Sequence, residues 1–521
     1  MPGRRWRPSW PATSPRRSRQ PKKRPSSASC RRPEPTTVER SSRSMASAPA
    51  ILTIDVGTSA LKAVLYSPTG HVVDQSTQRY AYRTEQPGWA EGDPETWWQA
   101  LQHALVDVGQ RVALDQVQVV ACTGQMHTAV LLDGAGQVLP PTILWLDRRA
   151  AQEAEELQRH LQLPPYQINS TYTLPKLLWL ARRRPARFAA AARICHAADF
   201  LVGRLTGCYD VSDTSNVLKT GYDVADGRWP AFFADLGVPL GKLPRVVRPG
   251  EPIARLTTQA ADKTGLSRLA IAVAGATDGT AGFLASGACD VGQWCSTLGT
   301  TLVLRGVSRT LLRDPLGRVY SHAHPEGHWL PGAASNVGGE CLEARFKGSR
   351  LAALDGEVSA HLPNPLLLYP LARRGERFPF VDPDARGFVQ GRARGRAELY
   401  AAHLEAVAFV ERWGYDILAG LGAPICDPVF ASGGAVASDV WLQLRADVLG
   451  RPLRVAADAH SAKGAALLAA AAAMGSLSEA VRRMVRFERS FTPRPGLRAY
   501  FDDKYGRFRA ACAERYPAAG A

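Results

Sequence analysis

Two stretches of this chain repeat one pattern, in which an apolar β-type run ends in a turn of small residues and a second such run follows. One stretch covers residues 50–66 and the other residues 292–304. The turn residues are Gly57, Thr58 and Ser59 in the first stretch, and Gly299, Thr300 and Thr301 in the second. Apolar runs separated by a few such turn residues are typical of β-hairpins. Two such hairpins roughly 240 residues apart predict two related domains, each of which offers a turn to the same ligand.

The rest of the chain reads as alternating strands and helices. Its 521 residues exceed what one compact core holds, so two or more domains are expected. Residues 94–109 have helical spacing, with Asp93 as the N-cap and Pro94 at the first helical position. The Ala-rich run at residues 465–474 predicts a buried helix, since it falls well short of the ~20 apolar residues of a membrane span. The class is therefore α/β, with a domain boundary near residues 289–291.

The net charge of +17 belongs mainly to the first 44 residues. They hold 13 Lys and Arg against two Glu, which is +11 of the total, and several prolines interrupt any helix there. We expect residues 1–48 to form a disordered basic extension; the alternative is a tether to nucleic acid or membrane. No cysteine lies in a CxxC pair, so zinc and redox motifs are not indicated and a reducing cytoplasm is expected.

The first turn has the chemistry of a phosphate cradle. Gly57 lets the backbone approach an anion closely, and the amides and hydroxyls of Thr58 and Ser59 can bind phosphate oxygens. Asp55 ends the strand before it, where a carboxylate can hold a magnesium ion. The second turn repeats this logic. Taken alone, each turn also fits an ordinary hairpin.

Three further groups follow predicted strands. Asp278 stands where a general base could accept a proton from a hydroxyl, although a helix N-cap explains an isolated Asp equally well. Gln125, Met126 and His127 follow a strand in the first domain, and Gln and His are good readers of hydroxyls. Gly433, Gly434 and Ala435 leave room for a flat base to lie against the backbone.

The order of these elements resembles that of the FGGY carbohydrate kinases, over roughly residues 51–515. Residues 54–59 (IDVGTS) are similar to the first phosphate motif of that family, and residues 175–179 (PKLLW) to the core of its first signature. Residues 375–377 (GER) and 382–387 (DPDARG) resemble a further family stretch, and residues 432–435 (SGGA) its adenosine turn. Arg392 and Ala406 depart from the second family signature.

The resemblance implies two ribonuclease-H-like domains of the actin/hexokinase superfamily with an interdomain active-site cleft. The N-terminal sugar-binding domain would cover residues 49–289 and the C-terminal ATP-binding domain residues 290–515. Asp278 matches the catalytic base, and Asp55 the acid near Mg²⁺ and the γ-phosphate. The remaining roles would fall to Gly57, Thr58, Ser59, Gly299, Thr300 and Thr301 for phosphates, to Gly433, Gly434 and Ala435 for adenosine, and to Gln125, Met126, His127, Trp145 and Asp147 for the sugar.

Two resemblances indicate different sugars as the substrate. Residues 123–127 (TGQMH) resemble the sugar-site motif of xylulokinases, which favours D-xylulose and its 5-phosphate. Stretches of the second half, such as residues 274–278 (AGATD), are closer to D-ribulokinase-type kinases. Another polyol or sugar-acid kinase and a non-catalytic sensor of sugar or nucleotide are the remaining alternatives. The expected partners are a sugar and ATP with Mg²⁺, without nucleic acid or membrane, and a homodimer is left open.

Overall fold

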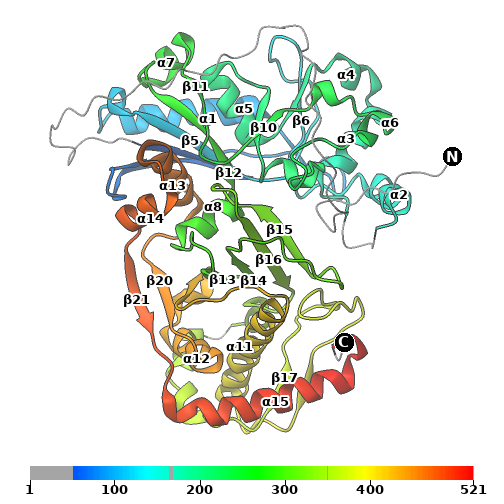
Figure 1. Ribbon diagram of the computed structural model, residues 1–521, viewed down its shortest axis with the longest axis vertical. Coiled ribbons are helices and arrows are strands. Elements are labelled where there is room, and N and C mark those ends of the chain that lie inside the picture. Colours follow the sequence, from blue (N-terminus) through cyan, green and yellow to red (C-terminus); the bar gives the residue numbers. More distant parts are fainter. Residues whose placement is uncertain (1–50, 164–167, 349, 520–521) are drawn as a thin grey trace. The chain divides into compact units, whose positions relative to one another are not determined.

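The structure is a computed structural model that describes residues 51–163, 168–348 and 350–519. It divides into two compact units (Figure 1). Unit 1 holds the described residues up to Gly282 together with His460–Met484, and unit 2 holds Phe283–Ala459 and the described residues from Val485 onward. The predicted extension over residues 1–48 lies outside the described residues.

Unit 1 is built on a six-stranded sheet in the order β11-β12-β5-β1-β2-β3. The first three strands in the chain form an antiparallel meander, whereas β5 and β12 run parallel to β1 on its other side. The bounds are β1 (Ile51–Val56), β2 (Ala60–Tyr66), β3 (Val72–Arg79), β5 (Val119–Gly124), β11 (Pro252–Arg255) and β12 (Ile271–Thr277).

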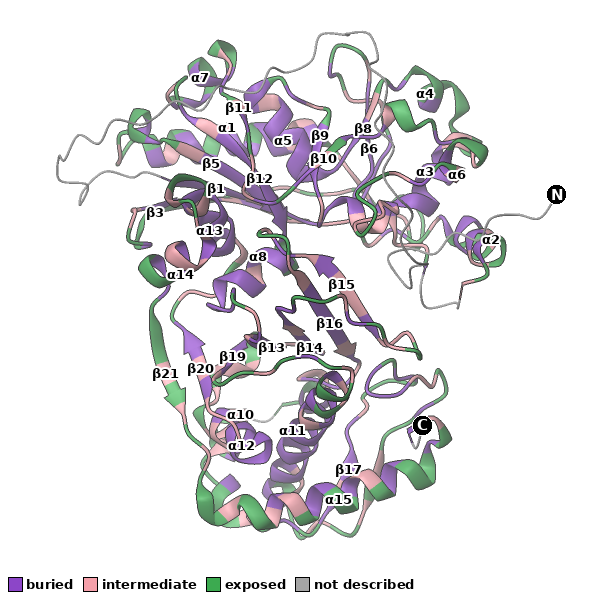
Figure 2. Cartoon of the chain, in the orientation of Figure 1, coloured by how far each residue is buried: buried purple, intermediate pink, exposed green. Residues whose placement is uncertain are grey.

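Helices cover both faces of this sheet, which explains why β1 is apolar on both sides. Helices α1 (Pro94–Gly109) and α5 (Ala197–Thr206) pack against one face and against each other, and α13 (Ser461–Met474) packs on β1, β5 and β12 (Figure 1). The predicted helix over residues 94–109 is confirmed, with Asp93 as its N-cap accepting from the amide of Glu95. The edge strand β3 is largely exposed, whereas β1 and β5 are buried (Figure 2).

Smaller elements complete unit 1. They are β4 (Glu91–Gly92), β6 (Val130–Leu132), β7 (Thr142–Ile143), β8 (Arg193–Cys195), β9 (Val211–Asp213), β10 (Arg245–Val247), α2 (Ala151–Leu161), α3 (Thr173–Arg183), α4 (Pro185–Ala190), α6 (Phe232–Asp235), α7 (Thr258–Thr264) and α14 (Leu477–Met484). Helix α8 (Asp278–Ala285) contains the point at which the chain passes from unit 1 to unit 2.

Unit 2 repeats the same arrangement of strand directions in a seven-stranded sheet, β15-β16-β14-β13-β19-β20-β21. Here β13, β14 and β16 form the antiparallel meander, and β19 and β20 run parallel to β13. The bounds are β13 (Trp294–Leu298), β14 (Leu302–Gly306), β15 (Val319–Ala323), β16 (Trp329–Ser335), β19 (Val429–Ser432), β20 (Leu453–Ala456) and β21 (Phe487–Phe491). The predicted pair of related α/β domains is confirmed in this repetition.

The longest helix described in unit 2 is the 25-residue α11 (Arg396–Gly420), which packs on α12 (Asp439–Leu449) and β14. The others are α9 (Glu340–Arg345), α10 (Leu351–Asp355) and α15 (Arg498–Arg515), and β17 (Leu367–Tyr369) pairs with β18 (Phe388–Gln390). Within the described ranges, no helix of either unit combines the length and the apolar composition needed to cross a membrane.

Candidate active site

Three parallel strands of unit 1 end side by side at one edge of its sheet. Asp55 on β1 pairs with Thr123 on β5, and the last residues of β5 and β12 pair with each other. Gln125 directly follows β5, and Asp278 directly follows β12. The fold therefore gathers Asp55, Gln125 and Asp278 at the carboxyl ends of neighbouring strands, where open α/β sheets bind their ligands.

The turn after β1 is held by hydrogen bonds at the amide and the carbonyl of Gly57, and the amides of the next two residues take no part in them. The Gly57 amide donates to the Ala60 carbonyl (2.9 Å), and the Gly57 carbonyl accepts from the Tyr80 hydroxyl (2.7 Å) and from Gln125 Nε2 (3.2 Å). The amides of Thr58 and Ser59 donate to no residue in the described ranges. Adjacent backbone N–H groups of a turn that have no acceptor within the protein are able to bind an anion.

Asp55 is half-buried at the end of β1, and its carboxylate accepts a hydrogen bond from the hydroxyl of Ser461 at the start of α13. Burial raises the pKa of Asp55, while the bond from Ser461 and the charge of Lys62 act in the opposite direction. Ser461 is not predicted from the sequence, because it lies 406 positions from Asp55 in the chain.

His127 lies in a left-handed backbone conformation (φ 62°), which is rare for a residue other than glycine. Its imidazole is buried, its Nε2 has no hydrogen-bond partner within the described part of the chain, and its ring centroid lies 5.2 Å from that of Tyr172. Burial, together with Lys219 and Lys176, holds the pKa of His127 well below its usual range, so the ring is neutral.

Gln125 is buried as well, and among the described residues its side-chain oxygen lacks a partner, while the neighbouring Met126 is half-buried. Buried polar atoms are rarely left unpaired in folded proteins. The Gln125 oxygen and His127 Nε2 are therefore chemically able to bond to hydroxyl groups of a ligand.

Lys176 joins the His127 loop to a second loop. Its fully buried side-chain nitrogen donates to the carbonyl of His127 (3.0 Å) and to the carbonyl of Leu144 (2.7 Å). Leu144 precedes Trp145, whose indole N–H donates to Thr58 Oγ1 (2.8 Å) and whose ring is 44% exposed. Lys176 thus ties the backbone of the His127 loop to the backbone of the loop that carries Trp145.

Asp147 differs from the other predicted sugar residues, because its carboxylate is wholly occupied inside the protein. Its exposure is 0%, and its oxygens accept from the Ala90 amide (2.5 Å) and from the Arg149 guanidinium (2.7 Å to the nearer Nη). Arg149 also reaches Glu91 (2.6 Å) and lies 3.7 Å over the ring of Trp89. In this structure both carboxylate oxygens of Asp147 are bonded within the protein, and the residue orders the loop that carries Trp145.

Unit 2 places its two predicted turns at one sheet edge in the same way. Neighbouring parallel strands β13 and β19 are joined there by Thr297 Oγ1 and Ser432 Oγ, 2.8 Å apart. Gly433 has φ 88°, and a Cβ at that position would lie 2.6 Å from the Leu298 carbonyl oxygen, so only glycine fits. The next residue, Gly434, is exposed and has open space around its Cα.

A second glycine pair, absent from the sequence predictions, supports the turn of unit 2. The Gly339 amide donates to the Gly299 carbonyl (2.7 Å), and the Glu340 amide donates to the Thr300 carbonyl (3.3 Å). A Cβ at Gly338 would lie 2.4 Å from the Thr300 carbonyl oxygen. Two consecutive glycines after an apolar strand indicate a close backbone contact. A single sequence does not show which turn they contact.

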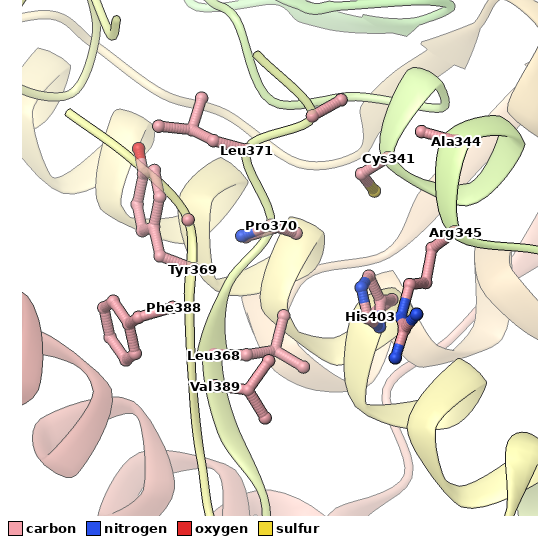
Figure 3. A pocket seen from close by; sticks show the side chains of 12 residues that line it. Cys341, Ala344, Arg345, Leu368, Tyr369, Pro370, Leu371, Phe388, Val389 and His403 are labelled. Carbon is pink, nitrogen blue, oxygen red and sulfur yellow. The ribbon is translucent and has the colours of Figure 1, made fainter. Parts of the chain in front are cut away.

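A cavity of about 330 Å³ also lies in unit 2, between β17 and α9 (Figure 3). Apolar side chains such as Leu368 and Val389 form much of its lining, with Arg345 and His403 on one side. His403 Nδ1 is bonded to the Leu399 carbonyl (2.8 Å), and burial lowers the pKa of that histidine. None of the predicted site residues lines this cavity, so it is separate from the turns described above.

Comparison with known proteins decides the family. Residues 50–285 match the N-terminal domain of the FGGY family of carbohydrate kinases, and residues 296–473 match its C-terminal domain. The chain belongs to the FGGY family of carbohydrate kinases. It is therefore a phosphotransferase that acts on an alcohol group, and ATP is the phosphate donor in this family.

Relatives of this FGGY kinase align with it over most of its length. The xylulose kinase of Escherichia coli (strain K12) is 32% identical over 439 residues, which cover 81% of this chain and 89% of the relative. A glycerol kinase of Paracidovorax citrulli is 29% identical, over 85% of this chain and 95% of the relative. The crystal structure of xylulose kinase from Rhodospirillum rubrum superimposes with a TM-score of 0.81 at 29% identity, over 90% of this chain and 99% of that chain.

Proposed function

We propose that this FGGY kinase transfers the γ-phosphate of ATP to D-xylulose and forms D-xylulose 5-phosphate. The observation that carries the proposal is the pair of unpartnered, buried polar atoms on Gln125 and His127, beside the strand end that bears Asp278. These residues belong to the stretch that resembles the xylulokinase sugar-site motif. Similarity to several xylulose kinases supports the same substrate.

The reaction requires a base for the sugar hydroxyl, and we assign that role to Asp278. The hydroxyl oxygen forms a bond to the γ-phosphorus while the bond from this phosphorus to the bridging oxygen breaks, and ADP leaves with that electron pair. The hydroxyl proton passes to the Asp278 carboxylate. The neutral ring of His127 and the amide of Gln125 hold other hydroxyls, so that the reacting oxygen stays in line.

The backbone turns supply the phosphate contacts in this proposal. The open amides of Thr58 and Ser59 bind phosphate oxygens in unit 1. In unit 2 the turn of Gly299, Thr300 and Thr301 has the same task, and the glycine-lined backbone at Gly433, Gly434 and Ala435 accepts the adenosine. Binding of charge by fixed donors is the main source of rate acceleration in phosphoryl transfer.

Asp55 has the chemistry of a magnesium ligand. Within the described ranges no group of three or more His, Cys, Asp or Glu side chains comes together to hold a metal. Magnesium usually takes one or two carboxylates together with substrate phosphates and water, and the half-buried Asp55 carboxylate fits that pattern. The ion would neutralise charge on the phosphate oxygens when bound. The expected cytoplasmic location and the homodimer stay predictions.

The test is a coupled assay of ADP release from MgATP with purified protein. The acceptors are D-xylulose, D-ribulose, L-ribulose, L-xylulose, gluconate and glycerol. Turnover chiefly on D-xylulose supports the proposal. Turnover chiefly on D-ribulose would make the second half of the chain the better guide to substrate, and no turnover on any acceptor would favour the sensor alternative.

A further inference from the structure

The strand that leads to Asp278 leaves the regular ladder of its sheet just before it ends. The pairing of β12 with β5 shifts register between Val273 and Ala276. Gly275 lies at the shift, and a Cβ there would stand 1.5 Å from the Cys122 carbonyl oxygen, so the backbones are in close contact. A bulge of this kind bends a strand and re-aims the residues that follow it.

Two buried side chains hold the bent strand end. Thr123 Oγ1 donates to the Ala276 carbonyl (2.7 Å), and the Thr277 amide donates to Ser215 Oγ (2.9 Å). Both hydroxyl-bearing residues have 0% exposure. Thr277 directly precedes Asp278, so the bond from its amide fixes the backbone from which the predicted base projects.

Ser215 is itself fixed by a buried carboxylate. Its hydroxyl donates to Asp213 Oδ1, which also accepts from the Ser215 amide (2.8 Å) and the Asn216 amide (3.2 Å). Asp213 Oδ2 accepts from Asn216 Nδ2. Asp213 is 3% exposed at the end of β9. The two backbone amides and the Asn216 side-chain N–H can only donate, so the Asp213 carboxylate is their acceptor. The Ser215 hydroxyl gives its one proton to Asp213. A lone pair of the Ser215 oxygen therefore remains to accept from the Thr277 amide.

We propose that Ser215, oriented by Asp213, is a positioning residue for the phosphoryl transfer, because it holds the strand end that aims Asp278 at the sugar hydroxyl. This inference rests on the proposed function. It predicts an effect on the chemical step with little effect on nucleotide binding, since a small displacement of a catalytic group is enough to slow a reaction whose geometry is tightly constrained.

The variants are Ser215→Ala, which removes the acceptor for the Thr277 amide, and Ser215→Cys, which keeps a weak one. The matched control is Thr264→Val at the end of α7. Its hydroxyl is also buried, donates to the Ala260 carbonyl (2.6 Å) and accepts from the Leu266 amide (3.4 Å), but it belongs to no part of the site. The control therefore reports the general cost of losing a buried hydroxyl.

Two quantities are measured for each protein, namely kcat with KM for D-xylulose and ATP, and hydrogen exchange of the segment over residues 271–285. We expect kcat of Ser215→Ala to fall about 10- to 100-fold with KM for ATP nearly unchanged. Ser215→Cys should be intermediate, and exchange in the segment should be faster only in the two Ser215 variants. The control should keep the wild-type kcat.

Wild-type kcat in Ser215→Ala, or unchanged exchange of residues 271–285, would overturn the inference. Equal losses of kcat in Ser215→Ala and Thr264→Val would overturn it too, because the effect would then be general. Absence of sugar turnover in the wild type would instead refute the proposed function. In that case the exchange measurement alone decides whether Ser215 holds the strand end.

Discussion

Ser461 donates a hydrogen bond from its hydroxyl to the carboxylate of Asp55. The two residues are 406 positions apart in the chain, yet both belong to unit 1, because α13 packs on β1. The bond favours the ionised carboxylate, against burial, which raises the pKa of Asp55. Ser461 is thus part of what keeps this acid charged.

Removal of the Ser461 hydroxyl should make the enzyme more sensitive to acid. In Ser461→Ala the pKa of Asp55 rises further, so the carboxylate is protonated at a higher pH than in the wild type. We expect kcat/KM to fall about 10-fold on the acid limb and to approach the wild-type value at alkaline pH. A pH–rate profile of both proteins measures this. Superimposable acid limbs would show that ionisation of Asp55 does not limit the reaction.

Substitution of His127 should affect the sugar and spare the nucleotide. Asn is the informative replacement, because it tolerates the left-handed conformation at φ 62° while it removes the imidazole. We expect KM for D-xylulose to rise about 10-fold or more in His127→Asn, which corresponds to the loss of a hydrogen bond of about 1.4 kcal/mol. KM for ATP should stay unchanged. Steady-state kinetics with each substrate varied in turn provide the test, and an unaltered KM for D-xylulose would remove His127 from the sugar site.

Lys176 should make stability depend on pH in a defined direction. Burial lowers its pKa from 10.5 to about 7, with Asp147 opposing that shift and Arg149 adding to it. Between these two values the unfolded chain binds a proton at Lys176 and the folded chain does not, so this group's contribution to stability rises with pH across that window. Below about pH 7 both states are protonated, and the cost of burying the charge is felt in full.

The comparison is with Lys176→Met, which cannot titrate. The difference in free energy of unfolding, wild type minus variant, should increase from about pH 7 to about pH 10. Urea denaturation at a series of pH values measures it. A difference that stays constant or decreases with pH would show that the buried amine is charged throughout. The variant also removes the donor to the His127 carbonyl and one of the two donors to the Leu144 carbonyl, which keeps the Asp147 amide, so KM for the sugar should rise.

The features predicted from sequence are those that neighbouring residues determine. The hairpin around Gly57, the helix that begins after Asp93, the buried Ala-rich helix and the glycine turn at Gly433 all follow from local patterns of apolar, capping and turn residues. Asp55, Gln125 and Asp278 lie at or just beyond the carboxyl ends of β1, β5 and β12, and they share one edge of the sheet because these strands are parallel neighbours.

Features that depend on distant contacts could not be predicted in this way. Ser461 reaches Asp55 only because residues 460–484 return to unit 1 between β20 and β21 of the second sheet. Ser215 and Asp213 look like ordinary turn residues until the Thr277 amide is found beside them. Asp147 lies in a motif expected near the sugar, but its burial under Arg149 depends on Trp89 and Glu91 from an earlier segment.

The central claim is that Asp278 accepts the proton of a D-xylulose hydroxyl while ATP is cleaved. It is tested most directly by product formation from D-xylulose and MgATP with the wild type and with Asp278→Asn, together with ATP affinity measured by calorimetry. The account predicts sugar phosphate from the wild type, a kcat lower by roughly 10²- to 10⁴-fold in the variant, and equal affinity for ATP. Full turnover by Asp278→Asn would contradict it.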